Sequence, residues 1–292
     1  MKAELLADCK NSLGEGCFWD ARTQSLWWTD IESSCVYSRT IAGKLTRFNL
    51  PGRAGFILPR RSGGFVLGFP NQVALADETL QTFTRVCDIE PDLPTTRVND
   101  AAVDPYGGIV FGTFDETFDM AARRPIGSVY RLAPDGTVQR LFGGAVVSNG
   151  LAFSPDGDVM YFADTHFGAI RRFAIGRDFS SFDEITPLTD GESAPGRPDG
   201  GITDSAGNYW SARVWGGCVV RFDISGLVTA KVDLPTKGPT CVAIGGADLR
   251  QLFVTTLRAR HTDAELEAAP TAGGLFSIQL DIPGSEPRLS EL

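Results

Sequence analysis

Six segments of one pattern recur through this chain, and their spacing is the feature that most restricts its fold. Each has an apolar run, a turn and a second run that ends in a small residue. They read CFWDARTQSLWWTD, FILPRRSGGFVLGF, AAVDPYGGIVFGT, LAFSPDGDVMYFAD, GITDSAGNYWSAR and VAIGGADLRQLFVTT. The small residues are Thr29, Gly68, Gly112, Ala163, Ala212 and Thr255, so successive units lie 39 to 51 residues apart. A period of this length, built from short strands, is typical of the blades of a β-propeller.

Further short strands follow most of the six segments. CVYSR, SVYRL, AIRRF and CVVRF supply a third strand, and KLTRFNL or TVQRLF a fourth. The pattern therefore predicts an all-β fold: a six-bladed β-propeller with four antiparallel strands per blade, forming a single domain over residues 1–292. The leading AELLA would supply the outer strand of the last blade and close the ring. Only TDAELEAA, at 262–269, reads as a short helix.

The charge balance and the start of the chain exclude several classes of partner. The net charge is −9 and no Lys/Arg-rich stripe occurs, which argues against a nucleic-acid backbone as a ligand. No apolar run has the length of a secretory signal or a membrane span, so no membrane association is expected. The six cysteines lie far apart without a CxxC pair, which favours reduced thiols and a cytoplasmic location. The sequence gives no indication of the oligomeric state.

Polar residues recur at one phase of the repeat, 13 or 14 residues before each small residue. The positions are Glu15, Gly55, Asn99, Asn149, Asp199 and Cys241. Equivalent positions of a propeller lie on one ring, here just before the first strand of each blade, and the first strands line the central channel. We therefore expect Glu15, Asn99, Asn149 and Asp199 to converge at one mouth of the channel. Their hard oxygen donors suit Ca²⁺, Mg²⁺ or Mn²⁺, with positions left open for water and substrate.

Each of these residues also has a structural interpretation. Asn149-Gly150 and Asp199-Gly200 are ordinary turn dipeptides, and Glu15 alone would be a surface acid. Their coincidence at one phase favours the functional interpretation. Cys241, in GPTCVAI, is interpreted as a wall residue rather than a nucleophile. The only histidines, His166 and His261, fall outside the shared phase, which argues against a Ser-His-Asp triad, and no phosphate-binding glycine motif occurs.

The chain resembles the regucalcin/gluconolactonase group of six-bladed sugar lactonases. The matching stretches are LGEG, RVNDAAVDPYG followed by FGT, SNGLAFSPDG, RPDGGITDSAGNYW and APTAGGLFSI, in order from about Leu13 to Ile278. The resemblance implies one divalent metal ion held by Glu15, Asn149 and Asp199, and substrate contacts from Arg97 and Asn99. It also implies a further acid from GTFDETFDMAARRP, for which Glu116 is the nearest candidate, offset by one residue.

The resulting hypothesis is a metal-dependent aldonolactonase that hydrolyses a small sugar lactone to the open acid. The metal would polarise the lactone carbonyl while Asp199 activates water as the catalytic base, a nucleophilic role being the alternative. Calcium is the expected ion, with Zn²⁺, Mn²⁺ and Mg²⁺ as alternatives. Two other functions stay open: hydrolysis of an aryl ester or organophosphate on the same fold, and a non-catalytic calcium-binding regulator. The loops 11–16, 115–125 and 193–197 are expected to shape the pocket.

Overall fold

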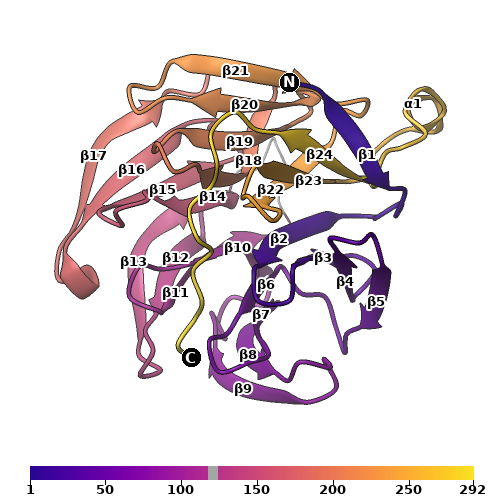
Figure 1. Ribbon diagram of the computed structural model, residues 1–292. Coiled ribbons are helices and arrows are strands. Elements are labelled where there is room, and N and C mark those ends of the chain that lie inside the picture. Colours follow the sequence, from indigo (N-terminus) through magenta and orange to yellow (C-terminus); the bar gives the residue numbers. More distant parts are fainter. Residues whose placement is uncertain (118–123) are drawn as a thin grey trace.

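A computed structural model describes residues 1–117 and 124–292 of the chain. Its strands form six sheets of four antiparallel strands, arranged around a central axis (Figure 1). Within each sheet the strands pair in chain order, except where the N-terminal strand joins the last sheet. The predicted six-bladed propeller is therefore confirmed, including the number of strands in each blade.

The six blades, numbered I to VI along the chain, have the following strands. Blade I has β2 (Gly14–Asp20), β3 (Ser25–Asp30), β4 (Cys35–Thr40) and β5 (Leu45–Asn49), and blade II has β6 (Phe56–Pro59), β7 (Phe65–Phe69), β8 (Gln72–Ala76) and β9 (Phe83–Asp88). Blade III has β10 (Thr96–Val103), β11 (Ile109–Asp115), β12 (Gly127–Leu132) and β13 (Val138–Ala145), and blade IV has β14 (Ser148–Phe153), β15 (Val159–Asp164), β16 (Ile170–Ile175) and β17 (Phe182–Thr189). Blade V has β18 (Arg197–Thr203), β19 (Tyr209–Val214), β20 (Cys218–Phe222) and β21 (Val228–Asp233), and blade VI has β22 (Pro239–Gly245), β23 (Gln251–Thr256), β24 (Leu275–Gln279) and β1 (Ala3–Ala7).

The ring closes as the sequence predicts. Strand β1 pairs antiparallel with β24, with Ala3 opposite Ile278 and Glu4 opposite Ser277. The last blade thus takes three strands from one end of the chain and one from the other, so that separating the two ends would break a sheet. This pairing also covers the free edge that β24 would otherwise expose.

Turn chemistry fixes the registers of the blades, as the stretch DPYG of blade III illustrates. The Asp104 carboxylate accepts the backbone N–H groups of Tyr106, at 2.7 Å, and of Gly108, at 3.0 Å. Gly107 has a φ of 84°, a conformation that a residue with a Cβ rarely adopts. The sharp turn brings Val103 opposite Ile109, which pairs β10 with β11.

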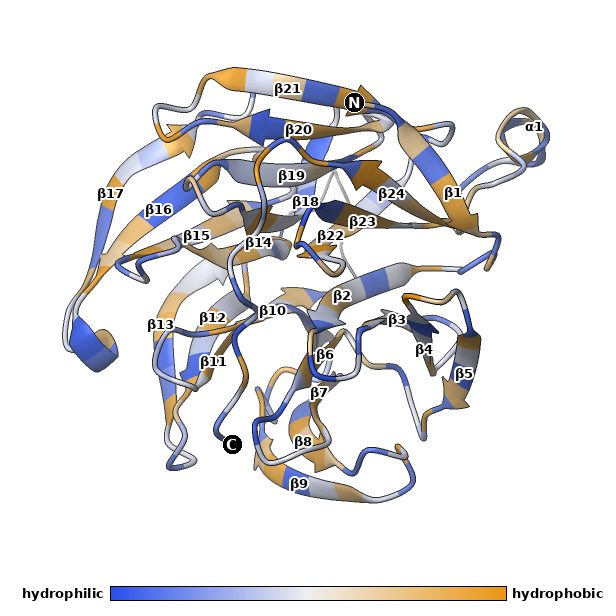
Figure 2. Cartoon of the chain, in the orientation of Figure 1, coloured by the Kyte–Doolittle hydropathy of each residue, from blue (hydrophilic) through white to orange (hydrophobic). Residues whose placement is uncertain are grey.

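The core lies between the faces of neighbouring blades. Trp27 of blade I, for example, packs on Phe65 of blade II, with ring centroids 4.7 Å apart. Figure 2 shows hydrophilic residues on the outer strands, such as β5, β17 and β21, among apolar ones. The outer strand β5 alternates between exposed and half-buried residues, whereas every residue of β3 is buried. Apolar side chains on both faces of the middle strands therefore hold adjacent blades together.

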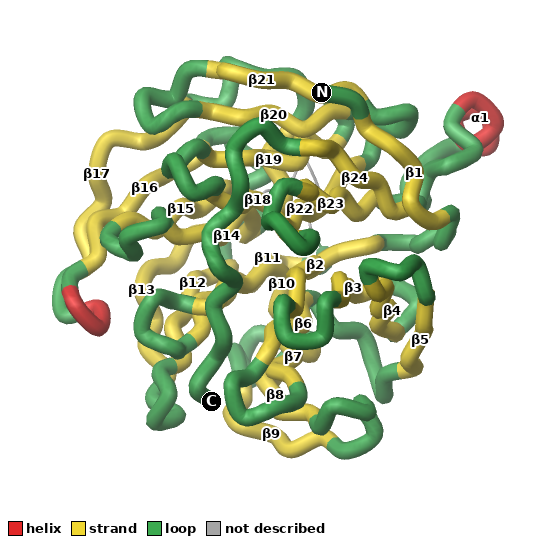
Figure 3. Tube along the Cα trace, viewed as in Figure 1, coloured by secondary structure: helices red, strands yellow, loops and turns green. Residues whose placement is uncertain are grey.

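Helix α1 (Asp263–Ala268) and the C-terminal tail complete the fold, together with the 3-10 turn η1 (Arg177–Phe179). Thr262 caps α1, and Glu265 returns the contact in a capping box, so the short helix predicted at 262–269 is confirmed. After β24 the tail crosses one face of the propeller as a loop (Figure 3). It pairs with blade V through Gly284 and with blade II through Ser290. Among the described residues, no helix has the length and apolar character that a membrane span requires.

Candidate functional site

A β-bulge interrupts the first strand of five blades at the same phase of the repeat. The pairing with the second strand shifts register between Glu15 and Phe18, Val98 and Ala101, Asn149 and Ala152, Pro198 and Gly201, and Pro239 and Val242. A bulge adds a residue on one strand and re-aims its side chain. The bulges therefore lie at or directly beside the phase positions at which polar residues were expected.

Blade II differs at this phase because there is no room for a side chain. A Cβ on Gly55 would lie 2.5 Å from the backbone oxygen of Asn99 and 2.6 Å from that of Val98. Strand β6 has an unshifted register, with Phe56 opposite Gly68. Gly55, the phase position of blade II, thus allows β6 to pack closely against β10 and supplies no donor.

The glycines beside Glu15 have a structural cause. Gly16 has a φ of 54°, and a Cβ there would lie 2.9 Å from the Cα of Phe56. A Cβ on Gly14 would lie 3.0 Å from the backbone oxygen of Thr256. Both contacts are with neighbouring blades, so glycine allows β2 to pass between blades VI and II while Glu15 stays half-buried at the bulge.

Asn99 and Asn149 form the direct link between blades III and IV. The Nδ2 group of Asn99 donates to the Oδ1 atom of Asn149 and to the backbone oxygen of Ser148, both at 2.9 Å. The Nδ2 group of Asn149 donates to Thr165 Oγ1 at 2.7 Å, and Thr165 donates to the backbone oxygen of Pro198 at 2.8 Å. This chain of bonds fixes the amide of Asn149 and links it to Pro198, the residue before Asp199, and it leaves Oδ1 of Asn149 with a second lone pair.

Three carboxylates meet beside this amide: Glu15, Asp100 and Asp199. Burial, and then the charges of Asp199 and Asp100, raise the pKa of Glu15 well above its usual range. Burial, and then the charge of Asp100, raise the pKa of Asp199 in the same direction, against Arg260 and Arg97. Burial raises the pKa of Asp100 to about 7, although the N–H groups of Leu151, Ala101 and Gly150 oppose the shift. The charges of these acids, which come from blades I, III and V, thus act on one another.

Asp100 was missed by the sequence analysis, which singled out only its neighbour Asn99. The signal was its position beside a phase residue, because a bulge brings two successive residues out of the ladder. Its carboxylate accepts the N–H of Ala101 at 2.8 Å and that of Leu151 at 2.9 Å, which ties β10 to β14. Thr165 was missed as well, since nothing in the sequence brings a loop threonine to Asn149.

The donor set fits a hard divalent cation. Two carboxylates and an amide oxygen are the ligands that such ions take, and a nearby cation would favour the ionised acids whose mutual repulsion now raises their pKa values. No described Lys, Arg or His forms an ion pair with Glu15, Asp100 or Asp199. Within 1–117 and 124–292, no group of three His, Cys, Asp or Glu side chains could hold a metal without other ligands. A site here therefore needs the amide of Asn149 beside the acids.

Arg97 and Glu116 lie together on blade III. Arg97 is buried and donates through Nη1 to Asn99 Oδ1 at 2.8 Å, while its Nε lies 3.3 Å from Glu116 Oε1. Arg53 donates hydrogen bonds to both carboxylate oxygens of Glu116, at 2.7 and 2.8 Å. Glu116, expected from the sequence to contact substrate, thus lies between two arginines. Burial lowers the pKa of Arg97 to about 10, against the charge of Glu116.

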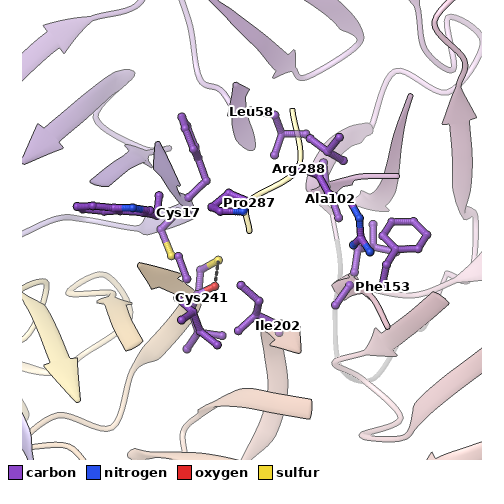
Figure 4. Close-up of a pocket in the computed structure, with 18 of the residues that line it drawn as sticks. Cys17, Leu58, Ala102, Phe153, Ile202, Cys241, Pro287 and Arg288 are labelled. Atoms are coloured by element: carbon purple, nitrogen blue, oxygen red, sulfur yellow. Dashed lines mark hydrogen bonds between the residues drawn. The ribbon is translucent and has the colours of Figure 1, made fainter. Parts of the chain in front are cut away.

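A mostly apolar cavity of about 170 Å³ lies further along the channel. Asp100 borders it, and Pro287 and Arg288 of the C-terminal tail lie in its wall (Figure 4). Cys17 and Cys241 point toward one another in this wall, in keeping with the structural interpretation of Cys241. The tail contacts the end of the channel where the first strands finish, as at Leu58 and Phe153, whereas Glu15 and Asp199 lie near their starts. Access to these acids is therefore from the opposite mouth.

Loops around that mouth come from several blades. The loop 115–125 follows the second strand of blade III, and its residues 118–123 lie outside the described part. The segment 193–197 is held by Arg213, which donates to the backbone oxygens of Ala194, Pro195 and Gly196. The segment 11–16 is anchored by the Asp30 carboxylate, which accepts the N–H groups of Ser12 and Leu13.

Comparison with known proteins relates the whole of this arrangement to one family. Residues 13–258 match the family described as the SMP-30/gluconolactonase/LRE-like region. L-arabinolactonase of Azospirillum brasilense is 38% identical over 95% of this chain and 92% of its own length. 6-Deoxy-6-sulfogluconolactonase of Pseudomonas putida is 34% identical over 94% of both chains. The crystal structure of regucalcin from Agrobacterium tumefaciens, described as a calcium-binding protein, superposes with a TM-score of 0.91 at 28% identity, covering 99% of this chain and 97% of that one.

Proposed function

The chain belongs to the SMP-30/gluconolactonase/LRE-like family, and from that premise we propose that it is a sugar lactonase dependent on one divalent metal ion. Its reaction is the hydrolysis of the cyclic ester of a sugar acid to the open-chain acid, which makes it a carboxylic-ester hydrolase. Relatives named for L-arabinolactone and for 6-deoxy-6-sulfogluconolactone support this class of substrate.

Glu15, Asn149 and Asp199 are the proposed ligands of the ion, with Ca²⁺ as the expected species and Zn²⁺, Mn²⁺ or Mg²⁺ as alternatives. The observation that carries the proposal is the electrostatic coupling of Glu15 to Asp199 beside the fixed amide of Asn149. Burying two like charges without a cation is unfavourable, and the bound ion would remove that cost. When bound, it would supply a Lewis acid for the ester carbonyl.

Asp199 is the proposed general base. Its carboxylate takes the proton from the attacking water and later returns it to the departing ring oxygen, so that the ester C–O bond breaks with no net change in the protein. This role requires the ionised carboxylate, which a neighbouring cation favours. Arg260 and Arg97 act on Asp199 in the same direction.

Arg97 and Asn99 are the proposed contacts to the sugar. Both N–H groups of the Asn99 amide are used, by Asn149 and Ser148, so Asn99 offers a substrate only a lone pair of Oδ1. No described acceptor bonds the Nη2 group of Arg97, which leaves it donors for ring or hydroxyl oxygens. Glu116 supports this side of the pocket by holding Arg97, in place of the direct contact expected from the sequence.

The experiment that tests the proposal is a rate assay on protein stripped with a chelator and reloaded with single divalent ions. Pentono- and hexonolactones are followed by acid release, with aryl esters and an organophosphate as comparison substrates. The proposal expects loss of lactone hydrolysis on stripping and its return with one ion. Faster turnover of the aryl ester or organophosphate would indicate the alternative hydrolase, and ion binding without turnover of any substrate would indicate a calcium-binding regulator.

A further inference from the structure

The loop after β23 brings an exposed arginine to the mouth where the acids meet. Leu257 pairs with Leu13, and the N–H of Ala259 donates to the backbone oxygen of Ser12 at 2.9 Å. Ser12 lies three residues before Glu15, so Arg260 follows directly on a segment that is bonded to the approach to Glu15. Arg260 itself is exposed and has no ion pair or side-chain hydrogen bond with any described residue.

The backbone of Arg260 is left-handed, with a φ of 64°. Glycine adopts this conformation without cost, whereas a residue with a Cβ loses about 1 kcal/mol or more. The next residue fixes the conformation: the His261 ring packs against Gly238 and lies 6.1 Å from the ring of Trp215. The loop is thus anchored on both sides of Arg260. These anchors maintain the strained backbone conformation of this exposed arginine.

The free charge acts on the candidate site. The charges of Arg260 and Arg97 oppose the rise in the pKa of Asp199, and Arg97 is paired with Glu116. Lys237, nearby on the loop before β22, is paired with Glu265. Among the described residues, no carboxylate forms an ion pair with Arg260, in a chain whose net charge is −9.

A cavity lies beside this loop. Its volume is about 420 Å³, and Trp215, Thr236, Lys237, His261 and Glu265 contribute to its lining. Trp215 is 41% exposed, with Lys237 Nζ 4.9 Å from its ring centroid. His261, which follows Arg260 directly, lines this cavity, so space next to Arg260 is available for a part of the substrate that projects away from the scissile ester.

We propose that Arg260 is a specificity-determining residue that binds an anionic group at the end of the lactone remote from its carbonyl. The arginine fork matches a carboxylate or a sulfonate, and no described residue forms an ion pair or side-chain hydrogen bond with it that a ligand would have to displace. The inference rests on the proposed function and deepens it, because it selects lactones of acidic sugars over neutral aldonolactones.

The test compares three lactones on the wild-type protein and its variants: neutral L-arabinonolactone, glucaro-1,4-lactone with its carboxylate, and 6-deoxy-6-sulfogluconolactone with its sulfonate. Arg260→Gly suits the φ of this position, so it removes the charge without adding backbone strain. Arg260→Lys keeps the charge but not the fork. Lys44→Ala is the matched control: Lys44 is also exposed and unpaired, but it lies in the turn from β4 to β5, at the opposite end of the blade.

We expect Arg260→Gly to lower kcat/KM for both anionic lactones at least tenfold more than for the neutral lactone, mainly through KM. Arg260→Lys should retain part of the preference, and Lys44→Ala all of it. Added NaCl should raise KM for the anionic lactones in the wild type and not in Arg260→Gly. Equal changes for anionic and neutral lactones, or no change with either, would overturn the inference and leave the proposed function standing. A wild-type protein that hydrolyses none of the three would overturn both.

Discussion

The Nδ2 group of Asn99 in β10 lies 2.9 Å from the Oδ1 atom of Asn149 in β14 and donates a hydrogen bond to it. This contact between blades, with the bond from Asn149 Nδ2 to Thr165, orients the amide of Asn149 so that its oxygen keeps a lone pair for the proposed metal ion. Second partners of this kind commonly set the affinity of a ligand for a metal.

Replacing either asparagine should therefore weaken metal binding to different degrees. Asn149→Ala removes the proposed ligand, and Asn99→Ala removes only the group that orients it, for which a loss of about 10- to 100-fold is typical. Calorimetric titration of the stripped proteins with Ca²⁺ and Mn²⁺ measures both. Asn208→Ala, in which the lost amide bonds Asp204 in a turn, is the control and should bind as the wild type does. Unchanged affinity in both site variants would contradict the assignment.

Asp199→Asn should separate metal binding from turnover. The variant keeps an oxygen donor but cannot accept the proton of water, so kcat should fall by about 10²- to 10⁴-fold. Because the charge of Asp199 raises the pKa of Glu15, metal-free Asp199→Asn should also titrate Glu15 at lower pH, which NMR of the carboxyl carbons would follow. A variant with wild-type turnover would remove Asp199 from the role of base.

Asp100 gives a pH dependence to the stability of the metal-free protein. Burial raises its pKa to about 7, whereas an aspartate in the unfolded chain titrates near 3.9. Between these values the folded protein holds a proton that the unfolded chain has released, so the free energy of unfolding should fall as pH rises from about 4 to 7. Denaturant melts in chelator should show a shallower decline for Asp100→Asn. The comparison concerns the slope, since the variant also loses an acceptor for Leu151 or Ala101.

Glu116→Gln tests the substrate side of the pocket separately. The change weakens the ion pairs of Glu116 with Arg53 and Arg97. Because a partly exposed ion pair contributes little free energy, KM for the lactone should rise by only up to about fivefold. Metal affinity should stay constant, because Glu116 contacts none of the proposed ligands. Glu184→Gln is the control. It weakens a similar bidentate pair between Arg171 and Glu184, which lies on the outer strand β17, and should leave KM unchanged. A fall in metal affinity with Glu116→Gln would place this acid at the ion instead.

Gly16→Ala should destabilise the fold through a contact between blades. The new Cβ would meet the Cα of Phe56 at 2.9 Å in addition to the cost of a positive φ, for a total of about 1–3 kcal/mol. Gly136→Ala is the control for the conformational part alone, since Gly136 has a φ of 88° and no atom within 4 Å of its Cβ position. Thermal melts should show a clearly larger loss for Gly16→Ala. Equal losses would show that the blade contact contributes nothing.

The repeat predicted the architecture because a propeller converts sequence phase into position on a ring. The small residues that end the second strands gave the number of blades, and AELLA gave the closing strand. The same logic predicted that Asn99 and Asn149 come together, as their hydrogen bond now shows. What the repeat could not predict depends on features that differ between blades. Asp100 lies at a bulge, Arg53 reaches Glu116 from outside blade III, and Arg260 lies on the long loop between β23 and β24.

The most direct measurement is anomalous diffraction from crystals of the protein soaked with Mn²⁺. The account predicts one strong anomalous peak at the mouth of the channel, within coordination distance of Glu15, Asn149 Oδ1 and Asp199. A peak bound by other residues, or none when these three side chains are ordered, would contradict it.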